Sequence, residues 1–588
     1  MPQTDDAPDS GDTPSAGPAT RFRERAVTLA KRGLGVDGPH HGFEVSSLHG
    51  DETEAPGLNK RETGQLRGIR RFGATGAVLM AIGALGAGAQ PVLQNPVQGL
   101  RILGLPARLG ATALTLTMTG SVMVVLAWLL LGRFAIGRYR GEGTAPRRLT
   151  RSQLDRTLLL WVIPLTVAPP MFSKDVYSYL AQSEITARGL DPYAIGPAQA
   201  LGVDHVLTRT VPTIWRDTPA PYGPLFLWIG RGISALTGEN IVAGIFLHRL
   251  LALVGVALIV WALPRLARRC GVASVTALWL GAANPLLLFH LVAGIHNEAL
   301  MLGLMLAGME LALRAVESAD PIRFDPRGAT AGGRNLLYLL AGSGLIALSA
   351  TVKIPSLLAL GFIGMALARR WGGTVRSVLA AAGLLMAVTA VVILVVSLAS
   401  GLGFGWLSPG TLGTANEVRS WMSLPTLLGL GTGLAGVFLG LGDHTTAVLN
   451  LTRPIASLAA AFVALRMLVA VLVGRVHPVG ALGVSLGVLV LLFPVVQPWY
   501  LLWAVIPLAA WATRPVFRIP AIVFSSAVSL IVMPNGGEYQ PFMIVQAAVA
   551  TILVVGLAMF LTRDRLPWRA GTGAPNGSGS AAEYAGTP

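Results

Sequence analysis

One acidic residue lies at the end of a long apolar run, where a charged carboxylate is energetically unfavourable next to lipid. Asp175 closely follows the apolar run 158–171. An acid at the point where a transmembrane helix meets water usually faces a polar cavity, because it is expensive to hold near lipid. A carboxylate in such a cavity can act as a general base that removes the proton of an attacking hydroxyl group. The structural alternative is that Asp175 only caps a helix over 176–187.

Further polar and aromatic residues interrupt apolar runs later in the chain. They are His296-Asn297-Glu298, Lys353-Ile354-Pro355, the segment 416–421 with Arg419, Gln497-Pro498-Trp499-Tyr500, and the segment 535–540. Acids among them could assist a base, cations could stabilise negative charge that develops in a reaction, and amides and aromatic rings could hold a polar substrate. We therefore take these segments as candidates for one functional surface.

Each candidate also has a structural explanation. Glu298 could stabilise the first turn of the following helix through the helix dipole. His296 lacks the spacing of a zinc site and could be a hydrogen-bonded structural residue. Lys353 and Arg419 could simply extend to the membrane surface, and the aromatic rings at 499 and 500 could belong to the interfacial belt.

The elements that must position these residues are membrane-spanning helices. The chain has 588 residues, of which 53% are hydrophobic and only 13% are charged. Apolar stretches recur at the length of about 20 residues that a transmembrane helix needs. These stretches are continuous and do not alternate as β-barrel strands do. The sequence therefore predicts an all-α polytopic membrane protein with about 13–15 transmembrane helices.

Fourteen spans are predicted between two polar tails. They lie near 72–89, 110–136, 156–172, 241–264, 273–292, 297–316, 335–351, 355–370, 376–402, 454–473, 479–495, 499–513, 517–534 and 541–562. The Gly-rich stretch 424–441 could be re-entrant or an additional span. The run 225–236 is short and is interrupted by Arg231, which predicts an interfacial helix.

The two ends of the chain differ from the apolar middle. Residues 1–70 begin with acidic, Pro- and Ser-rich sequence and are predicted to be a disordered cytoplasmic tail, without a signal peptide. Within this tail, 21–32 could form a basic interfacial helix or remain disordered. Residues 71–563 are predicted to be the transmembrane domain, and 564–588 a disordered cytoplasmic tail.

The net charge of +16 does not indicate a nucleic-acid partner, because the basic residues form short clusters between apolar runs. This pattern is typical of cytoplasmic loops. With a cytoplasmic N-terminus, each of these clusters falls inside: 138–151, 265–269, 369–376, 514–518 and 563–569. The assignment holds throughout if 424–441 does not cross. Cys270 is the only cysteine, so no intramolecular disulfide can form, and an incidental reduced thiol is expected.

The same topology places Asp175 and the other candidate segments on the extracytoplasmic side. No soluble nucleotide pool exists there, and no Walker A or dinucleotide-binding pattern is present. An enzyme on this face must draw an activated substrate from the membrane, and a polyprenyl phosphate carrier fits. A transporter or lipid flippase would instead place charged residues at the membrane midplane, whereas here they gather at one boundary. A scaffold for an envelope complex that binds through its 1–70 tail is a third possibility.

The Asp175 segment carries a family resemblance. An apolar span that leads directly into an Asp-bearing outer loop resembles the GT-C superfamily of glycosyltransferases. The loop itself is similar to that of the actinobacterial α-(1→6)-mannopyranosyltransferases, which build the mannan backbone of lipomannan and lipoarabinomannan in the cell envelope: Ser173-Lys174-Asp175-Val176-Tyr177-Ser178-Tyr179-Leu180-Ala181-Gln182. The stretch 294–300 resembles that family too, although in the family we expect Asp as readily as Glu at the position of Glu298. The resemblance covers about 72–562.

The resemblance implies a polyprenyl-phosphate-mannose donor, a lipid-linked mannoside acceptor and inversion at the anomeric carbon, in the plasma membrane with both termini cytoplasmic. Asp175 would be the general base, and Glu298 a second acid that positions the acceptor or assists the base. Lys353 and Arg419 are candidates for the donor phosphate, with Lys174 a third. The remaining candidates for substrate binding are Tyr177, His296, Asn297, Gln497, Trp499 and Tyr500. No paired-aspartate motif occurs in the loop, so no cofactor or metal is predicted. Another polyprenyl-phosphate sugar, such as glucose or arabinofuranose, remains an alternative donor.

Overall fold

The computed structural model describes residues 48–52, 55–137, 147–325, 330–417, 419–537 and 539–568. Up to the middle of the chain the elements are α2 (Lys60–Ala87), α3 (Leu105–Arg108), α4 (Gly110–Ile136), α5 (Arg151–Val167), α6 (Asp175–Ala187), α7 (Pro197–Leu201), α8 (Val206–Thr210), η1 (Thr213–Trp215), α9 (Pro224–Thr237), α10 (Ile241–Arg269), α11 (Ser274–Gly281) and the π-helical turn η2 (Leu287–Ala293). They continue with α12 (Glu298–Val316), α13 (Ala331–Ala350), η3 (Ile354–Leu357), α14 (Leu358–Arg370), α15 (Val375–Ala399), η4 (Gly405–Leu407), α16 (Pro409–Glu417), α17 (Leu424–Phe438), α18 (Thr445–Leu472), α19 (Pro478–Leu492), η5 (Pro498–Tyr500), α20 (Leu501–Ala509), α21 (Pro515–Ile531) and α22 (Pro541–Leu561).

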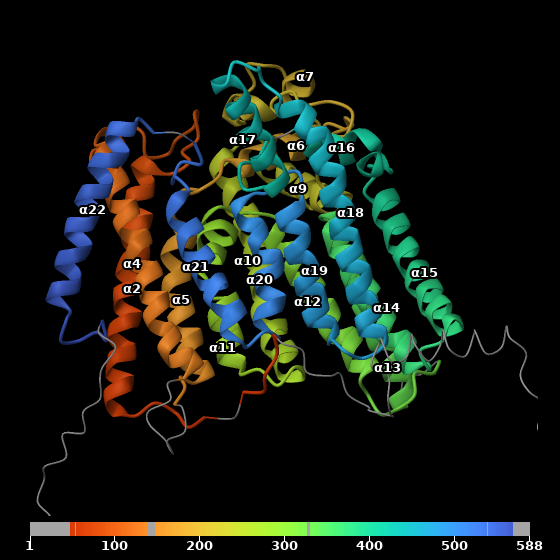
Figure 1. Ribbon diagram of the computed structural model, residues 1–588. Helices are drawn as coiled ribbons and strands as arrows, with labels where there is room; N and C mark the ends of the chain where they lie inside the picture. The colour runs from red at the N-terminus through yellow and green to blue at the C-terminus, as the bar shows by residue number, and fades with distance from the viewer. Residues whose placement is uncertain are drawn as a thin grey trace, which may run out of the picture.

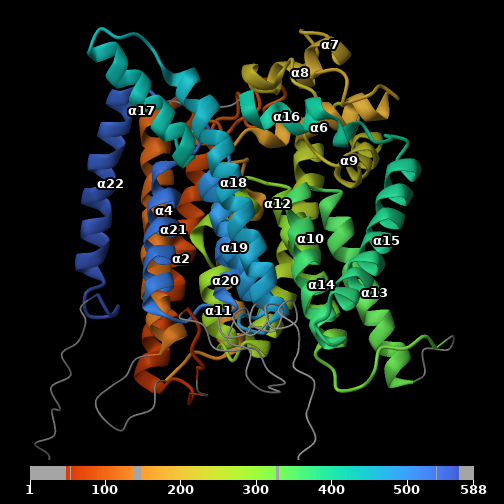
Figure 2. The ribbon, with the colours of Figure 1, turned by 45° about the vertical axis from the view of Figure 1, so that its right-hand side comes forward.

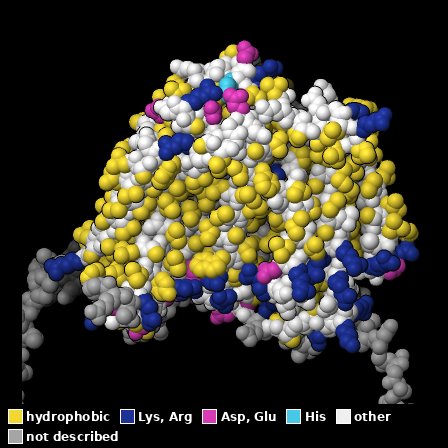
Figure 3. Space-filling model, turned by 180° about the vertical axis from the view of Figure 1, so that it is seen from behind, with side chains coloured by type: hydrophobic (Ala, Val, Ile, Leu, Met, Phe, Trp, Pro, Cys, Tyr) yellow, Lys and Arg dark blue, Asp and Glu magenta, His cyan; other side chains and the backbone are white. Residues whose placement is uncertain are grey.

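The long helices run side by side, and the short helices α6 to α9, together with α16, gather at one end of the bundle (Figures 1 and 2). By length and composition, six of the described helices can cross a membrane, namely α4, α10, α12, α15, α18 and α22. On the face shown in Figure 3, hydrophobic side chains form a broad band, and lysines and arginines gather along the lower rim. This all-helical, membrane-protein architecture confirms the predicted fold class.

Close backbone approach holds the first helices together. A Cβ atom on Gly76 of α2 would lie 2.8 Å from the carbonyl oxygen of Gly120 in α4, and one on Gly120 would lie 2.4 Å from that of Gly76. Small residues permit such contact, which is the main source of helix association in lipid. Further along, the indoles of Trp128 and Trp279 stack at 5.1 Å, and each donates to the other's carbonyl oxygen.

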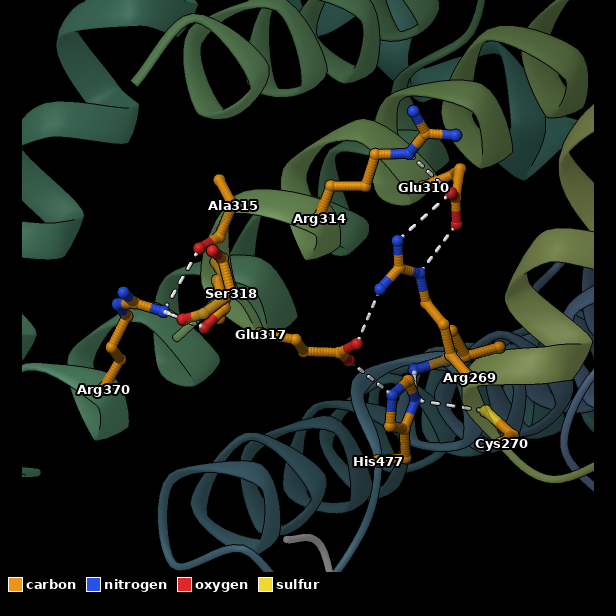
Figure 4. Close-up of polar contacts among 11 residues, drawn as sticks. Arg269, Cys270, Glu310, Arg314, Ala315, Glu317, Ser318, Arg370 and His477 are labelled. Atoms are coloured by element: carbon orange, nitrogen blue, oxygen red, sulfur yellow. Dashed lines mark hydrogen bonds and ion pairs between the residues drawn. The ribbon is translucent and has the colours of Figure 1, made fainter. Parts of the chain in front are cut away.

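An ionic network ties the helices together at the end opposite α6 to α9 (Figure 4). Arg269, at the end of α10, pairs with Glu310 of α12 and with Glu317, which directly follows α12, at 2.7 Å in each case. His477, which precedes α19, contacts Glu317 at 2.9 Å. Arg370 of α14 donates to carbonyl groups at the end of α12. Because buried Glu310 is paired, this network fixes four helices without leaving an isolated charge.

Several predicted boundaries need correction. The first helix begins at Lys60, twelve residues before the predicted span, so the predicted 1–70 tail is too long. Asn59 and Glu62 form a capping box, which starts the helix within polar sequence. The predicted span 273–292 is broken between α11 and η2, at Asn284-Pro285. Residues 1–47 and 569–588 lie outside the described residues, as do the predicted helix at 21–32 and the arginines at 138 and 140.

Other boundary predictions agree with the helices. The run 225–236 forms the short helix α9 among the elements at one end of the bundle (Figure 2). Within 424–441, α17 has only 15 residues, about 22 Å at 1.5 Å per residue. That length is less than the roughly 30 Å of a bilayer core, which favours the re-entrant alternative for this stretch.

Candidate active site

Asp175 is the first residue of α6, at the end of the bundle where the short helices gather. Its carboxylate does not cap that helix: the N-cap position belongs to Lys174, and no side chain makes a capping hydrogen bond. Instead, the backbone N–H of Asp175 donates to the Ser173 hydroxyl at 3.1 Å. The Asp175 side chain is 25% exposed. The capping explanation is therefore wrong, and the carboxylate is available to a substrate.

The loop that carries Asp175 is held from three sides. Met171 N–H donates to the carbonyl of Ala293 at 3.1 Å, and Phe172 N–H donates to that of Pro534 at 2.8 Å. The carbonyl of Pro170 accepts from Ala89 N–H, also at 2.8 Å. Phe172 has a φ of +66°, an unfavourable conformation for a residue with a side chain, and such strain concentrates at functional sites.

A second loop brings another carboxylate to Asp175. It connects η2 to α12 and contains Ile295, which also has a positive φ, of +60°. Glu298 begins α12 and is almost fully buried. His296 lies between the two acids: its Nδ1 is 3.5 Å from Asp175 Oδ2 and 4.0 Å from Glu298 Oε2. The two acids predicted from distant parts of the chain are thus brought into one site.

Lys353 neutralises Glu298. Its ammonium group forms a short ion pair with Glu298 Oε1 and donates to the hydroxyl of Tyr500 at 3.1 Å. It also lies 4.5 Å from the centre of the Tyr500 ring, a cation–π distance. Lys353 therefore does not simply extend to the membrane surface.

Burial and charge raise the pKa of Asp175 to about 6. Burial has the largest effect, and the Glu298 carboxylate adds to it, whereas Lys353 and the Ser173 hydrogen bond act in the opposite direction. Near neutral pH the group is ionised but is a stronger base than an ordinary carboxylate. This balance suits a general base, whose best pKa lies close to the working pH.

Aromatic rings surround the acids. The Trp499 ring stacks on His296 at 3.5 Å, and the Tyr500 ring stacks on Trp503 at 4.2 Å. On the α6 side, Tyr179 contacts the ring of Tyr222 edge to face at 5.2 Å. Tyr179 and Tyr222 were missed as site residues. For Tyr179 the sequence does contain a signal, because its spacing of four residues from Asp175 puts Asp175 and Tyr179 on one helix face.

Several buried polar atoms around Glu298 have no hydrogen-bond partner among the described residues. They include Glu298 Oε2, both side-chain polar atoms of Asn297, both ring nitrogens of His290 and Nε1 of Trp499. Leaving one such group unpaired costs roughly 1–3 kcal/mol. A cluster of them beside two carboxylates makes this part of the interior a candidate binding site.

Other predicted site residues lie apart from this cluster. The Tyr177 hydroxyl donates to the carbonyl of Ala89, so this residue supports the loop and does not face the acids. Arg419 is exposed and donates to the Thr446 hydroxyl at 3.3 Å. Gln497 is half-buried, and its carbonyl accepts from Tyr500 N–H. Lys174, beside Asp175, makes no ion pair with any described residue.

Comparison with known proteins agrees with this arrangement. The family profile described as "Alpha-(1->6)-mannopyranosyltransferase, N-terminal domain" matches residues 70–369, which contain both carboxylates and Lys353. The chain belongs to this family. The "MptB C-terminal domain" profile matches residues 425–560, which supply Trp499 and Tyr500. The site is therefore assembled from both matched regions.

Curated relatives extend over nearly the whole chain. A "Probable alpha-(1->6)-mannopyranosyltransferase" of Mycolicibacterium smegmatis is 59% identical over 533 residues, 89% of this chain and 94% of that protein. An alpha-(1->6)-mannopyranosyltransferase of Mycobacterium tuberculosis is 58% identical over 564 residues, covering 90% and 94%. Alpha-(1->6)-mannopyranosyltransferase B of Corynebacterium glutamicum is 41% identical over 496 residues, covering 84% and 81%. This membrane protein is a glycosyltransferase, and the transferred sugar is mannose.

Among solved structures, the archaeal oligosaccharyltransferase AglB of Archaeoglobus fulgidus, in complex with an inhibitory peptide and a dolichol-phosphate, aligns with a TM-score of 0.33 and 12% identity. The alignment covers 76% of this chain and 55% of AglB. A likeness this slight supports no statement about the site.

Proposed function

We propose that the enzyme transfers mannose from a polyprenyl-phosphate-mannose donor to a lipid-linked mannoside and forms an α-(1→6) linkage with inversion. The observation that carries the proposal is the exposed edge of Asp175 beside a buried, charge-compensated Glu298–Lys353 pair. In the reaction, the 6-hydroxyl oxygen of the acceptor attacks C1 of the donor mannose. Asp175 takes the hydroxyl proton, and the bond from C1 to the phosphate oxygen breaks with its electron pair on the leaving phosphate.

We expect Glu298, the predicted second acid, to assist the base and to position a substrate. Its carboxylate is held by Lys353, so it is not free to take the acceptor proton. Its negative charge instead raises the pKa of Asp175, and its unpartnered Oε2 can accept a hydrogen bond from a sugar hydroxyl. Repulsion between the two carboxylates alone would raise the pKa of Asp175 until the group was protonated near pH 7. The positive charge of Lys353 offsets this repulsion.

Lys174 is the best candidate for the donor phosphate. It adjoins Asp175 and makes no ion pair with a described residue, whereas Lys353 is already paired. An ammonium group at this position can stabilise the charge that grows on the departing phosphate. Arg419 is exposed and can attract an anionic lipid at longer range.

An apolar cavity suits the isoprenoid chain of such a donor. It has a volume of about 710 Å³ and lies between α14, α15 and Leu468 of α18; Figure 2 shows α15 standing at the edge of the bundle beside α14. The α15 lining extends from Val378 to Leu394, about 24 Å along the helix at 1.5 Å per residue. Leu357, four residues after Lys353, also lines the cavity. A long apolar chain can therefore lie here with its phosphate directed toward the site.

The direction of the bundle in the membrane follows from charge. Lysines and arginines gather along the lower rim in Figure 3, whereas α6, which begins with Asp175, lies at the upper end of the bundle in Figure 1. Such basic residues are retained on the cytoplasmic side. We therefore place the site on the extracytoplasmic side of the plasma membrane, with both termini in the cytoplasm. There the product mannan would contribute to lipomannan and lipoarabinomannan.

The test is an assay with purified protein, labelled polyprenyl-phosphate mannose and an α-mannoside acceptor. Asp175→Asn keeps the shape of the side chain and removes its basicity, so we expect transfer to fall by about 10²–10⁴-fold. The control is Asp204→Asn, at an exposed acid near the same end of the bundle, which should transfer normally. Transfer that survives in Asp175→Asn would refute the base assignment, and no transfer by wild-type protein would refute the donor. Activity in EDTA tests the prediction that no metal is needed.

A further inference from the structure

One buried histidine beside the site takes no part in the proton transfer. His290 lies in η2, and none of its surface is exposed. Neither of its ring nitrogens has a hydrogen-bond partner among the described residues. A buried polar group without a partner is costly. An imidazole that served only to fill space would be replaced at lower cost by an apolar ring.

His290 lies within the wall of the active site. Its ring centre is 5.5 Å from that of Trp499 and 6.0 Å from that of His296. On the other side it contacts the ring of Phe172, at 5.8 Å, in the loop that precedes Asp175. The indole nitrogen of Trp499 and the amide of Asn297 are also buried without partners. Because Asn297 directly precedes Glu298, three hydrogen-bonding side chains without partners in the described part of the chain lie in the segments around the two carboxylates.

The backbone around His290 is unusual as well. Residues 287–293 form a π-helical turn, which is rare and occurs most often at functional sites. A second buried histidine provides a contrast: His248 in α10 is also in the protein interior, but its Nδ1 is 2.9 Å from the carbonyl of Gly244. Burial alone therefore does not explain why both nitrogens of His290 are free.

We propose that His290, with Asn297 and Trp499, binds a ring hydroxyl of a mannosyl unit and so determines which sugar the enzyme accepts. The inference rests on the proposed function. A neutral imidazole offers one donor and one acceptor, which match the donor and acceptor of a hydroxyl group. A sugar that lacks this hydroxyl leaves the buried imidazole unpaired, and sites built in this way reject such analogues strongly. The mannosyl unit belongs to either the donor or the acceptor, which have the same ring chemistry.

The test combines protein variants with sugar analogues. We would measure kcat/KM for the mannosyl donor and its 2-, 3- and 4-deoxy analogues, and then for the same series on the acceptor. His290→Phe keeps an aromatic ring against Phe172 and removes both nitrogens. We expect wild-type protein to discriminate against one analogue by about tenfold to a hundredfold, as a buried hydrogen bond of ordinary strength allows. His290→Phe should lose this discrimination, by transferring mannose and that analogue at similar rates.

The control is His248→Phe, which should keep the wild-type order of preference. If His290→Phe loses discrimination among the donor analogues, the bound mannosyl unit is that of the donor. If it loses discrimination among the acceptor analogues, the bound unit is that of the acceptor. Equal loss of rate on every analogue in His290→Phe, with a lower thermal midpoint, would show that His290 only packs and would overturn the inference. Unchanged discrimination would overturn it too.

A binding measurement separates this inference from the proposed function. Asp175→Asn holds the donor without consuming it, so its affinity for mannosyl and deoxy donors can be compared with and without His290→Phe. Loss of discrimination in binding supports the hydroxyl contact even if transfer follows another mechanism. Affinities that respond to His290→Phe equally for all donors refute the contact, whatever the outcome of the transfer assay.

Discussion

The loop between α21 and α22 should control the position of Asp175. Gly536 has a φ of +63°, and a Cβ atom added to it would lie 2.7 Å from the Cα of Ser173 and 2.9 Å from its N and C atoms. Ordinary contact begins at 3.4 Å, so Gly536→Ala requires a shift of about 0.7 Å between the two backbones. Ser173 is two residues from Asp175, and misplacement of a reacting group by about 1 Å can cost 10²-fold in rate.

We therefore expect Gly536→Ala to lower kcat by about tenfold to a hundredfold, with the KM for the donor nearly unchanged. The left-handed conformation adds a stability cost of about 1–2 kcal/mol, which thermal unfolding in detergent would register. The matched control is Gly537→Ala, whose added Cβ meets nothing closer than 3.8 Å. If Gly536→Ala turned over as fast as Gly537→Ala, or if it changed only KM, the loop would not position the base.

Three further predictions follow from the site and the cavity. Because the pKa of Asp175 is about 6 and the ionised form is active, kcat/KM should fall tenfold per pH unit below about pH 6. Glu298→Gln removes the repelling carboxylate and keeps the other charged or titratable groups near Asp175, which are His296, Lys353, Tyr179, Tyr222 and Tyr500, together with its chain neighbour Lys174. The acid limb of its pH profile should therefore move to lower pH, and an unmoved limb would mean that another group titrates. Lys353→Met leaves Glu298 charged and unpaired in the interior, so it should lower the free energy of unfolding by about 3–5 kcal/mol. Adding Glu298→Gln to the same chain should recover most of this stability. A double variant as unstable as Lys353→Met would contradict the pairing. Ala390→Phe fills the α14–α15 cavity and should raise the KM for a long-chain donor but not for a short-chain donor. The control Ala387→Phe, on the same helix but outside the cavity lining, should change neither KM. Equal effects of Ala390→Phe on both donors would exclude the cavity as the binding site of the isoprenoid chain.

The sequence was enough to predict the helical architecture and the two carboxylates, because hydrophobic runs and misplaced charges are local signals. The partners of the carboxylates are not local. Nothing in the segment around Lys353 indicates that its ammonium group binds Glu298, 55 residues earlier, rather than a phosphate. Likewise, the residue type is the same at 177 and 179, and only the i+4 spacing of Tyr179 from Asp175 distinguishes them in the sequence. The tertiary contacts add that Tyr177 donates to the carbonyl of Ala89, whereas Tyr179 lies near the two acids. Charge and residue type therefore indicated the candidate residues, and tertiary contacts show which of them lie together.

The early start of α2 and the broken span at Asn284-Pro285 have a common cause. Hydropathy shows which part of the chain is apolar, not which part is helical. It therefore misses a polar first turn that is capped by Asn59 and Glu62. At the break, the opposite error occurs: the segment 273–292 is predominantly apolar, but Pro285 cannot donate a backbone hydrogen bond. The chain then winds into η2 and presents His290 next to Trp499. An irregular backbone is tolerated at membrane depth only where protein surrounds it, and every residue of η2 is buried. The break is thus what allows a polar side chain from an apolar span to reach the active site, and this is the reason to look for substrate specificity there.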